Sequence, residues 1–224
     1  MINLADHVWL FPYELKVLGV DIRRNVTIFR LLSGKLVIHS TAPFTDGDVA
    51  RVRELGEASW LVEGMLDHDT FSELGRQAFP EIPFLAPAGF GRRVNFQVGS
   101  LDAPPSEWLP ELEVIRIDGA PSMAESVFFH HPSGTLVVCD LLFHFPDPPS
   151  WWAKFLLGVG LGFDPTPGFS KRLKFSIKDK EAFGASLERV MDLAIQRIVP
   201  GHGMVLEDHA KQRAKKKFAS EGYA

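Results

Sequence analysis

Hydrophobic residues along the chain follow two patterns that alternate from one segment to the next. Runs of β-branched and aromatic residues bounded by turn residues predict strands, and apolar residues spaced three and four apart predict helices. In the first half these patterns predict helices over 46–55 and 70–78 and strands over 8–11, 25–31, 35–40, 60–62 and 82–86. Alternating strands and helices are typical of a layered α/β domain.

The second half of the chain repeats this alternation. The patterns predict helices over 179–195 and 206–217, and strands over 112–117, 126–131, 135–139 and 197–199. An irregular stretch rich in Pro, Gly, Trp and Phe interrupts them at 145–169. Because no low-complexity linker separates the halves, we expect a single domain over residues 1–224 with the 145–169 stretch as an insertion.

Composition and charge narrow the function classes. The chain has 224 residues, of which 46% are hydrophobic and 23% charged, and its formal net charge is −4. These values fit a globular protein and give no support for a nucleic-acid partner, which a basic face would indicate. Cys139 is the one cysteine, so no internal disulfide can form. Neither a signal peptide nor an integral membrane segment is evident, and we expect a cytoplasmic protein.

The aromatic segment 151–157, WWAKFLL, lies inside the 145–169 insertion. Such a segment can serve as a lid over a site, as the face of a homodimer, or as core packing. An interfacial membrane helix is a further alternative, but one lysine makes a weak polar face. The sequence leaves these interpretations open.

Acidic and imidazole residues occur where predicted strands end. Asp67 and His68 lie between a strand and a helix, Asp140 ends a strand, and His202 lies in a Gly-His-Gly turn after the last strand. Sheets of α/β proteins place their sites beyond the carboxyl ends of strands. Two carboxylates and two imidazoles suit zinc, iron or manganese better than calcium or magnesium. The residues alone also allow a structural interpretation, in which Asp67 caps a helix and the others are turn residues.

Three segments, taken in order, resemble the metallo-β-lactamase-fold superfamily. Its members carry His-x-His-x-Asp-His after a strand, a further His in a later loop, an Asp at the end of the next strand and a final His near the C-terminus. The corresponding segments here are EGMLDH at 63–68, SVFFHHPSGTLVVCD at 126–140 and VPGHG at 199–203. KLVIHSTAPF and RLKFSIKDKEAFGASLERV add a narrower likeness to one branch of the superfamily.

The departures from the superfamily pattern concern one metal position. Glu63 and Met65 stand where two His ligands belong, and Ser122, or Pro121, stands at the third. The segment 37–40, VIHS, replaces an early Asp-x-Gly. The resemblance therefore implies a degenerate branch that lacks the first metal site. It also implies a four-layer αββα sandwich whose second metal site is held by Asp67, His68, Asp140 and His202.

The resemblance implies a mononuclear metal-dependent hydrolase with a small-molecule substrate that the sequence does not name. Zinc is the expected metal, with iron and manganese as alternatives. Asp67 and Glu63 are the candidate catalytic residues, because burial of an unpaired Glu63 would raise its pKa into the range useful for a general acid or base. The alternative is a non-catalytic binding or interaction protein that keeps the fold. Metal content of the purified protein discriminates the two.

Overall fold

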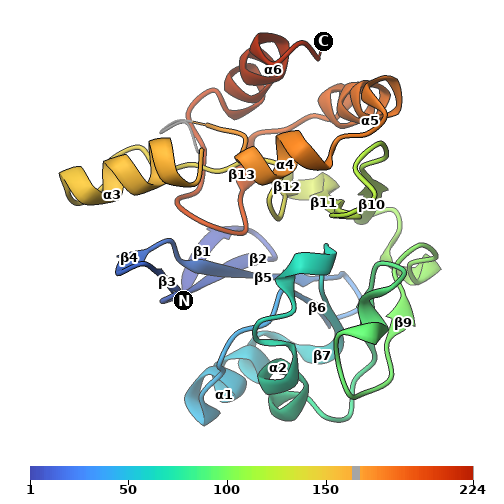
Figure 1. Ribbon diagram of the computed structural model, residues 1–224. Coiled ribbons are helices and arrows are strands. Elements are labelled where there is room, and N and C mark those ends of the chain that lie inside the picture. The colour runs from blue at the N-terminus through green and yellow to red at the C-terminus, as the bar shows by residue number, and fades with distance from the viewer. Residues whose placement is uncertain (163–166, 224) are drawn as a thin grey trace.

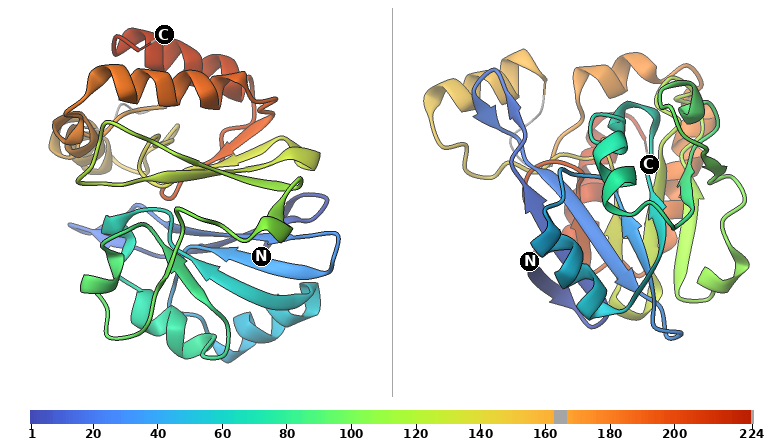
Figure 2. Two further views of the ribbon diagram at one scale, coloured as in Figure 1. Left: turned by 90° about the vertical axis from the view of Figure 1, so that its right-hand side faces the viewer. Right: turned by 90° about the horizontal axis from the view of Figure 1, so that it is seen from below.

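Two β-sheets pack face to face, and helices cover the outer face of each. The computed structural model describes residues 1–162 and 167–223. Figure 2 shows four layers in its left view: α5 (Lys180–Asp192) and α6 (Ala210–Ser220), the two sheets, and then α1 (Asp46–Leu55) and α2 (Ser72–Ala78). The four-layer αββα sandwich expected from the sequence is confirmed.

The first sheet is mixed and has seven strands. The N-terminal strands are antiparallel, whereas β6 to β9 run parallel. In spatial order the strands are β1 (Ile2–Ala5), β2 (Val8–Tyr13), β5 (Arg24–Arg30), β6 (Lys35–His39), β7 (Glu57–Val62), β8 (Phe84–Ala86) and β9 (Gly99–Ser100). Parallel strands end at the same edge of a sheet, so the loop after β7 lies at the edge where β6 and β8 also end.

The second sheet has four strands, β10 (Leu112–Arg116), β11 (Ser126–His130), β12 (Thr135–Val137) and β13 (Arg197–Val199). The first three are antiparallel neighbours, and β12 pairs in parallel with β13. This parallel pair brings two segments distant in sequence to one edge, where Asp140 follows β12 and His202 follows β13. The strand order thus places both residues together.

Three hydrophobic clusters hold the layers together. The cluster between the sheets includes Phe29 and Val62 from one sheet and Phe128 and Val137 from the other, all at most 1% exposed. One further cluster lies beneath α1 and α2 and another beneath α5 and α6. Full burial of one such side chain stabilises the fold by about 1.5–3 kcal/mol, so these layers dominate its stability.

Local signals fix the ends of the helices. Thr45 caps α1 and forms a reciprocal capping box with Asp48. The predicted helix 206–217 begins only at Ala210, because the Leu206 backbone pairs with Ile198 through hydrogen bonds of 2.8 and 2.9 Å. Short 3₁₀ turns occupy connecting segments: η1 (Leu66–His68), η2 (Phe90–Arg92), η3 (Ser106–Trp108) and η4 (His131–Ser133).

The insertion predicted at 145–169 contains more regular structure than expected. α3 (Trp151–Phe155) continues as a π-helical segment, Leu156–Gly160, and α4 (Lys171–Ser176) follows the stretch. Residues 163–166 of the insertion lie outside the described residues. Figure 1 shows α3 beside the hairpin of β3 (Lys16–Val17) and β4 (Val20–Asp21), which the sequence patterns did not predict.

α3 and the β3–β4 hairpin share a small apolar cluster and also expose apolar surface. Val20 and Ile22 pack with Ala153 and Leu156. The outer side of the same region carries exposed apolar residues, which we call the aromatic patch: Leu18, Trp151, Trp152, Phe155 and Val159. No helix within residues 1–162 and 167–223 is long and apolar enough to cross a membrane.

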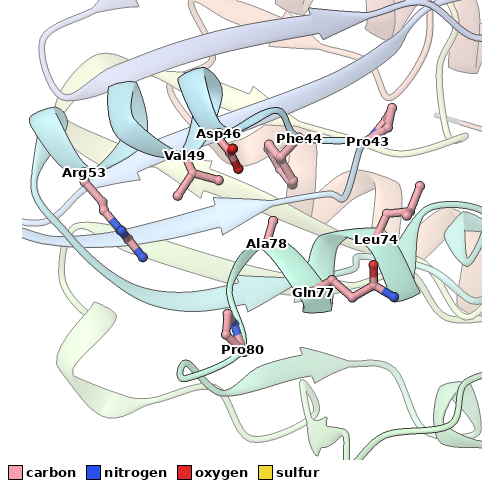
Figure 3. A pocket seen from close by; sticks show the side chains of 9 residues that line it. All are labelled: Pro43, Phe44, Asp46, Val49, Arg53, Leu74, Gln77, Ala78 and Pro80. Atoms are coloured by element: carbon pink, nitrogen blue, oxygen red, sulfur yellow. The ribbon is translucent and has the colours of Figure 1, made fainter.

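A groove of about 540 Å³ lies between α1 and α2 on the outside of the first sheet. Figure 3 shows Phe44 and Val49 on one side and Leu74 and Ala78 on the other. None of the metal ligands predicted from the sequence lines this groove. The predicted ligands lie instead at the carboxyl ends of the strands.

Candidate metal centre

Three of the four predicted ligands converge at the shared edge of the two sheets. One nitrogen each of His68 and His202 and one carboxylate oxygen of Asp140 all lie within 4.8 Å of one another. The His68 Nε2 is 3.2 Å and the His202 Nε2 is 3.6 Å from the Asp140 Oδ1. Ligands of a tetrahedral zinc ion at ~2.0–2.2 Å are separated by roughly 3.3–3.6 Å, so the donor spacing suits such an ion.

The backbone allows this convergence because of a glycine before His202. A Cβ atom on Gly201 would lie 2.7 Å from the His68 Cε1 and 2.9 Å from the Cys139 backbone oxygen. The Gly201 amide also donates to that oxygen over 3.0 Å. A larger residue would push the turn away from His68, so the glycine brings the loop after β13 against the loop after β12.

His202 is fixed in orientation by two contacts. Its Nδ1 lies 2.6 Å from the backbone oxygen of Arg23. Because a carbonyl only accepts, Nδ1 carries the proton and the lone pair of Nε2 faces Asp140. The ring stacks on Phe143 with an interplanar angle of 3°. An outer partner that fixes tautomer and ring orientation is characteristic of metal-binding histidines.

His68 is fully enclosed at the same edge. Its Nε2 contacts Asp140, whereas its Nδ1 is 3.9 Å from the nearest oxygen of Glu63, too far for a hydrogen bond. Nδ1 is a buried atom without a hydrogen-bond partner in the described part of the chain. Its ring meets that of His202 edge-on, with centroids 5.2 Å apart.

Burial sets the protonation of these three groups. It lowers the pKa of His68 to about 3, with Arg24 adding to the effect, and it lowers the pKa of His202. Burial alone would raise the pKa of Asp140, but His68, His202 and Arg24 bring it down to about 2. At neutral pH both imidazoles are neutral and the carboxylate is ionised, which is the state in which they bind metal.

Asp67, the fourth predicted ligand, lies apart from the other three. Its Oδ2 accepts from the Nε of Arg172 over 2.7 Å and also from that residue's Nη2. Its Oδ1 is 3.3 Å from the Nη2 of Arg93. The Asp67 carboxylate is thus held by two arginines, and its role as a ligand stays a prediction.

Glu63, the other predicted catalytic residue, is fully buried, but it is paired. Both carboxylate oxygens accept from the Nη2 of Arg24, over 2.9 and 3.1 Å. One oxygen also accepts from the backbone amide of Thr41 over 2.8 Å and from its hydroxyl. Burial nevertheless raises the pKa of Glu63 to about 6, against the opposing effect of Arg24.

Glu125 supports the loop that carries Asp140. Its two carboxylate oxygens accept from the backbone amides of Cys139, Asp140 and Leu141, over 2.7, 3.1 and 3.2 Å. Burial raises its pKa to about 8. These contacts give Glu125 a structural task in the loop.

No protein-family model matches the chain, and no curated protein matches it. Solved structures do match over nearly the whole length. DIM-1 metallo-β-lactamase aligns with a TM-score of 0.64 and 16% identity, over 98% of this chain and 95% of that chain. FIM-1 from Pseudomonas aeruginosa, in its mono-zinc form, aligns with a TM-score of 0.64 and 13% identity, over 100% and 96%. A metallo-β-lactamase from Hirschia baltica reaches 0.66 at 11% identity, over 96% and 95%.

The chain has the metallo-β-lactamase fold. Identities this low establish the fold alone, because unrelated chemistries share folds. Within this fold, His68, Asp140 and His202 come from the three segments whose motifs carried the resemblance.

Three consecutive residues, Arg23 just before β5 and Arg24 and Asn25 at its start, also hold this edge of the metallo-β-lactamase fold, and sequence reasoning missed them. The Arg23 carbonyl meets His202, and the Nη2 of Arg24 also donates to the His68 backbone oxygen over 3.0 Å. The Nδ2 of Asn25 donates to the backbone oxygens of Pro200 and Gly203 over 2.8 and 3.0 Å. The available signal was a pair of polar residues, Arg24 and Asn25, directly before the apolar residues of the strand.

Proposed function

We propose that the protein is a metal-dependent hydrolase with one metal ion, held by His68, Asp140 and His202, that acts on a small-molecule substrate. The convergence of two neutral imidazoles and one carboxylate carries this proposal. Two histidines and one carboxylate form a common ligand set of hydrolytic zinc, with the remaining position open to water or substrate. Zinc is therefore the proposed metal, with iron and manganese as alternatives.

The metal would lower the pKa of a bound water and polarise a carbonyl or phosphoryl oxygen of the substrate. The chain's own residues fix the three ligands: Arg23 sets the tautomer of His202, and Glu125 holds the Asp140 backbone. Of the two predicted catalytic residues, Asp67 is 17% exposed and can reach a substrate or serve as a fourth ligand. Glu63 is fully enclosed, and we assign it the positioning of His68 through Arg24.

The residues at the first-metal positions support a single ion. Glu63 is committed to Arg24 and Thr41, and Met65 is fully buried in the hydrophobic cluster beneath α5 and α6. The thioether of Met65 and a Glu63 carboxylate whose oxygens already accept hydrogen bonds are poor substitutes for two imidazole ligands of zinc. We therefore propose that this position does not bind metal.

The test is metal analysis of protein purified without chelator, followed by a panel of ester, thioester, lactam and phosphodiester substrates. We expect about one equivalent of metal per chain and hydrolysis of one substrate class that chelation abolishes. Absence of bound metal, with no zinc uptake in calorimetry, would overturn the proposal and favour a non-catalytic binding protein.

We also propose a single domain that forms a homodimer in the cytoplasm. The aromatic patch supports self-association, since Trp151 is 78% and Leu18 71% exposed. The lone Cys139 is buried, which fits a reducing compartment. Sedimentation velocity of the wild type and of Trp151→Ser tests the dimer, which the substitution should weaken.

A further inference from the structure

Two guanidinium groups close on one carboxylate immediately beside the proposed metal centre. Arg172 of α4 binds one oxygen of Asp67 through two nitrogens, and Arg93, which follows η2, contacts the other oxygen. Arg93 also contacts Asp69, with its Nη1 3.2 Å from the Asp69 Oδ2. We call Arg93 and Arg172 the arginine clamp.

The arginine clamp joins the two halves of the chain next to a predicted metal ligand. Asp67 directly precedes the ligand His68, Arg93 belongs to the first half of the chain, and Arg172 belongs to the second half. The exposed fractions of the Arg93 and Arg172 side chains are 37% and 61%, whereas that of Asp67 is 17%. The two cations are thus open to solvent, whereas the carboxylate between them is mostly buried.

The two exposed arginine heads add only modestly to the stability of the fold. Exposed ion pairs contribute about 0–1 kcal/mol, because ordering two long side chains offsets much of the attraction. The planar guanidinium matches the geometry of carboxylate and phosphate groups, and this match makes arginine common where such groups are recognised. The clamp already holds one carboxylate from within the chain, so its geometry suits an anion of the same shape.

Arg24 differs from the arginine clamp in its exposure and in its partners. Arg24 is only 2% exposed, and its donors reach Glu63 and the backbone oxygens of Thr41 and His68. No substrate can replace these partners without opening the core. The two arginines of the clamp are exposed, so a ligand from solvent can reach them and compete with Asp67.

We propose that the arginine clamp is the subsite for a carboxylate or phosphate group of the substrate. The proposal rests on the proposed function, which places the reacting centre at His68, Asp140 and His202. Asp67 holds the subsite in the absence of substrate, and the substrate's anion replaces its carboxylate. The displaced Asp67 is then available for the role as ligand or catalytic group predicted from the sequence.

Asp67→Asn tests this proposal by weakening the internal competitor. Binding of inorganic phosphate and of acetate is measured by calorimetry on the zinc-loaded and the chelator-treated protein. If the clamp is open in ~10% of wild-type molecules, Asp67→Asn should tighten anion binding about tenfold. Asp69→Asn is the matched control, since Asp69 contacts Arg93 but not Arg172, and it should change affinity by less than about twofold.

Arg172→Gln in the Asp67→Asn background should abolish the gained anion affinity. Asp67→Ser repeats the test if Asp67→Asn unfolds, as judged by circular dichroism. Unchanged affinity in the Asp67 variants, or retained affinity after Arg172→Gln, would overturn the subsite. Zinc uptake by the wild type, measured by calorimetry, keeps the two proposals separate. No zinc uptake together with the anion response refutes only the hydrolase, whereas zinc uptake without the anion response refutes only the clamp.

Discussion

Two groups of buried polar side chains lie at the same sheet edge, and they differ in how their bonding capacity is used. In the first group, His68, Asp140 and His202 point donor atoms at one another over 3.2 and 3.6 Å. In the second, Arg24 and Glu63 satisfy each other and their backbone neighbours. His68 and Asp140 share a hydrogen bond, but the His202 Nε2 is too far from Asp140 for one and has no other hydrogen-bond partner in the described part of the chain. Buried polar groups are normally hydrogen-bonded, so this free nitrogen facing a carboxylate favours a ligand site.

The second group shows how a polar cluster can persist without a ligand. A buried ion pair recovers the cost of desolvation only when its remaining donors and acceptors are also satisfied. Arg24 meets this condition through the backbone oxygens of Thr41 and His68. Proximity of charged residues is therefore insufficient evidence for a metal site, because such residues can satisfy one another's hydrogen bonds, as Arg24 and Glu63 do.

Removal of one convergent imidazole should have the largest effect. We expect His202→Ala to weaken zinc binding by more than the 10–100-fold typical of outer-shell changes, because it removes a direct ligand. Calorimetry and metal analysis measure the loss. His131→Ala is the control, since His131 is exposed and pairs with Glu113. Unchanged stoichiometry and affinity in His202→Ala would show that the convergent group is not the metal site.

The comparison also marks what the sequence can predict. Strand periodicity and the three motifs anticipated the layers and three residues that meet, His68, Asp140 and His202, because the ends of parallel strands share an edge. The ion pairs of Asp67 could not be anticipated. Its partners, Arg93 and Arg172, lie 26 and 105 residues away (93 − 67 and 172 − 67), and no local pattern specifies such contacts.

The burial of Arg24 could not be predicted either, because it also depends on tertiary contacts. A charged residue at a strand start is ordinarily solvated, and only the packing of β5 against the loop after β7 makes it buried. The β3–β4 hairpin was missed because two-residue strands carry no measurable alternation. Hydrophobic periodicity predicts the strands and helices, whereas the partners of individual side chains depend on tertiary contacts.

Breaking the buried Arg24–Glu63 pair should lower the stability of the fold more than it lowers zinc binding. Arg24→Met leaves the Glu63 carboxylate buried and unpaired, so we expect a loss of about 3–5 kcal/mol in the free energy of unfolding. Arg24→Met combined with Glu63→Gln should lose less than the single variant. Urea unfolding measures both, and one equivalent of zinc should remain bound. A single-variant loss below about 1 kcal/mol would contradict the assigned role of the pair.

His39 extends the comparison to acid stability. Burial, with His68 and Arg24 adding to it, lowers the pKa of His39 to about 3 from the ordinary 6.5, so the unfolded chain binds a proton that the folded chain does not. Its contribution to stability is fully present above pH 6.5 and is lost as pH falls toward 3.

His39→Leu should therefore flatten the pH dependence of metal-free protein. Between pH 6 and 4 the slope of unfolding free energy should fall by about 1.4 kcal/mol per pH unit. The imidazole Nδ1 has no partner in the described part of the chain, so an apolar replacement of similar size should cost little at neutral pH. Equal slopes in wild type and variant, measured by urea unfolding across this range, would refute the assignment.

The smallest expected effect concerns Asn25, which follows Arg24 in β5 and bonds to the turn that carries His202. Its side chain donates to the backbone oxygens on both sides of the His202 turn, from Pro200 and Gly203. Asn25→Ala leaves these oxygens without that donor and loosens the turn, while the backbone bond from Asn25 to Gly201 remains. Because the ligand itself is retained, we expect zinc affinity to fall by about tenfold, the low end for residues that orient ligands.

Thr27→Val is the matched control on β5, since the Thr27 hydroxyl has no hydrogen-bond partner in the described part of the chain and should not influence zinc binding. If both variants bind zinc like the wild type, the convergent group keeps its geometry without Asn25, and the contribution assigned to Asn25 is wrong.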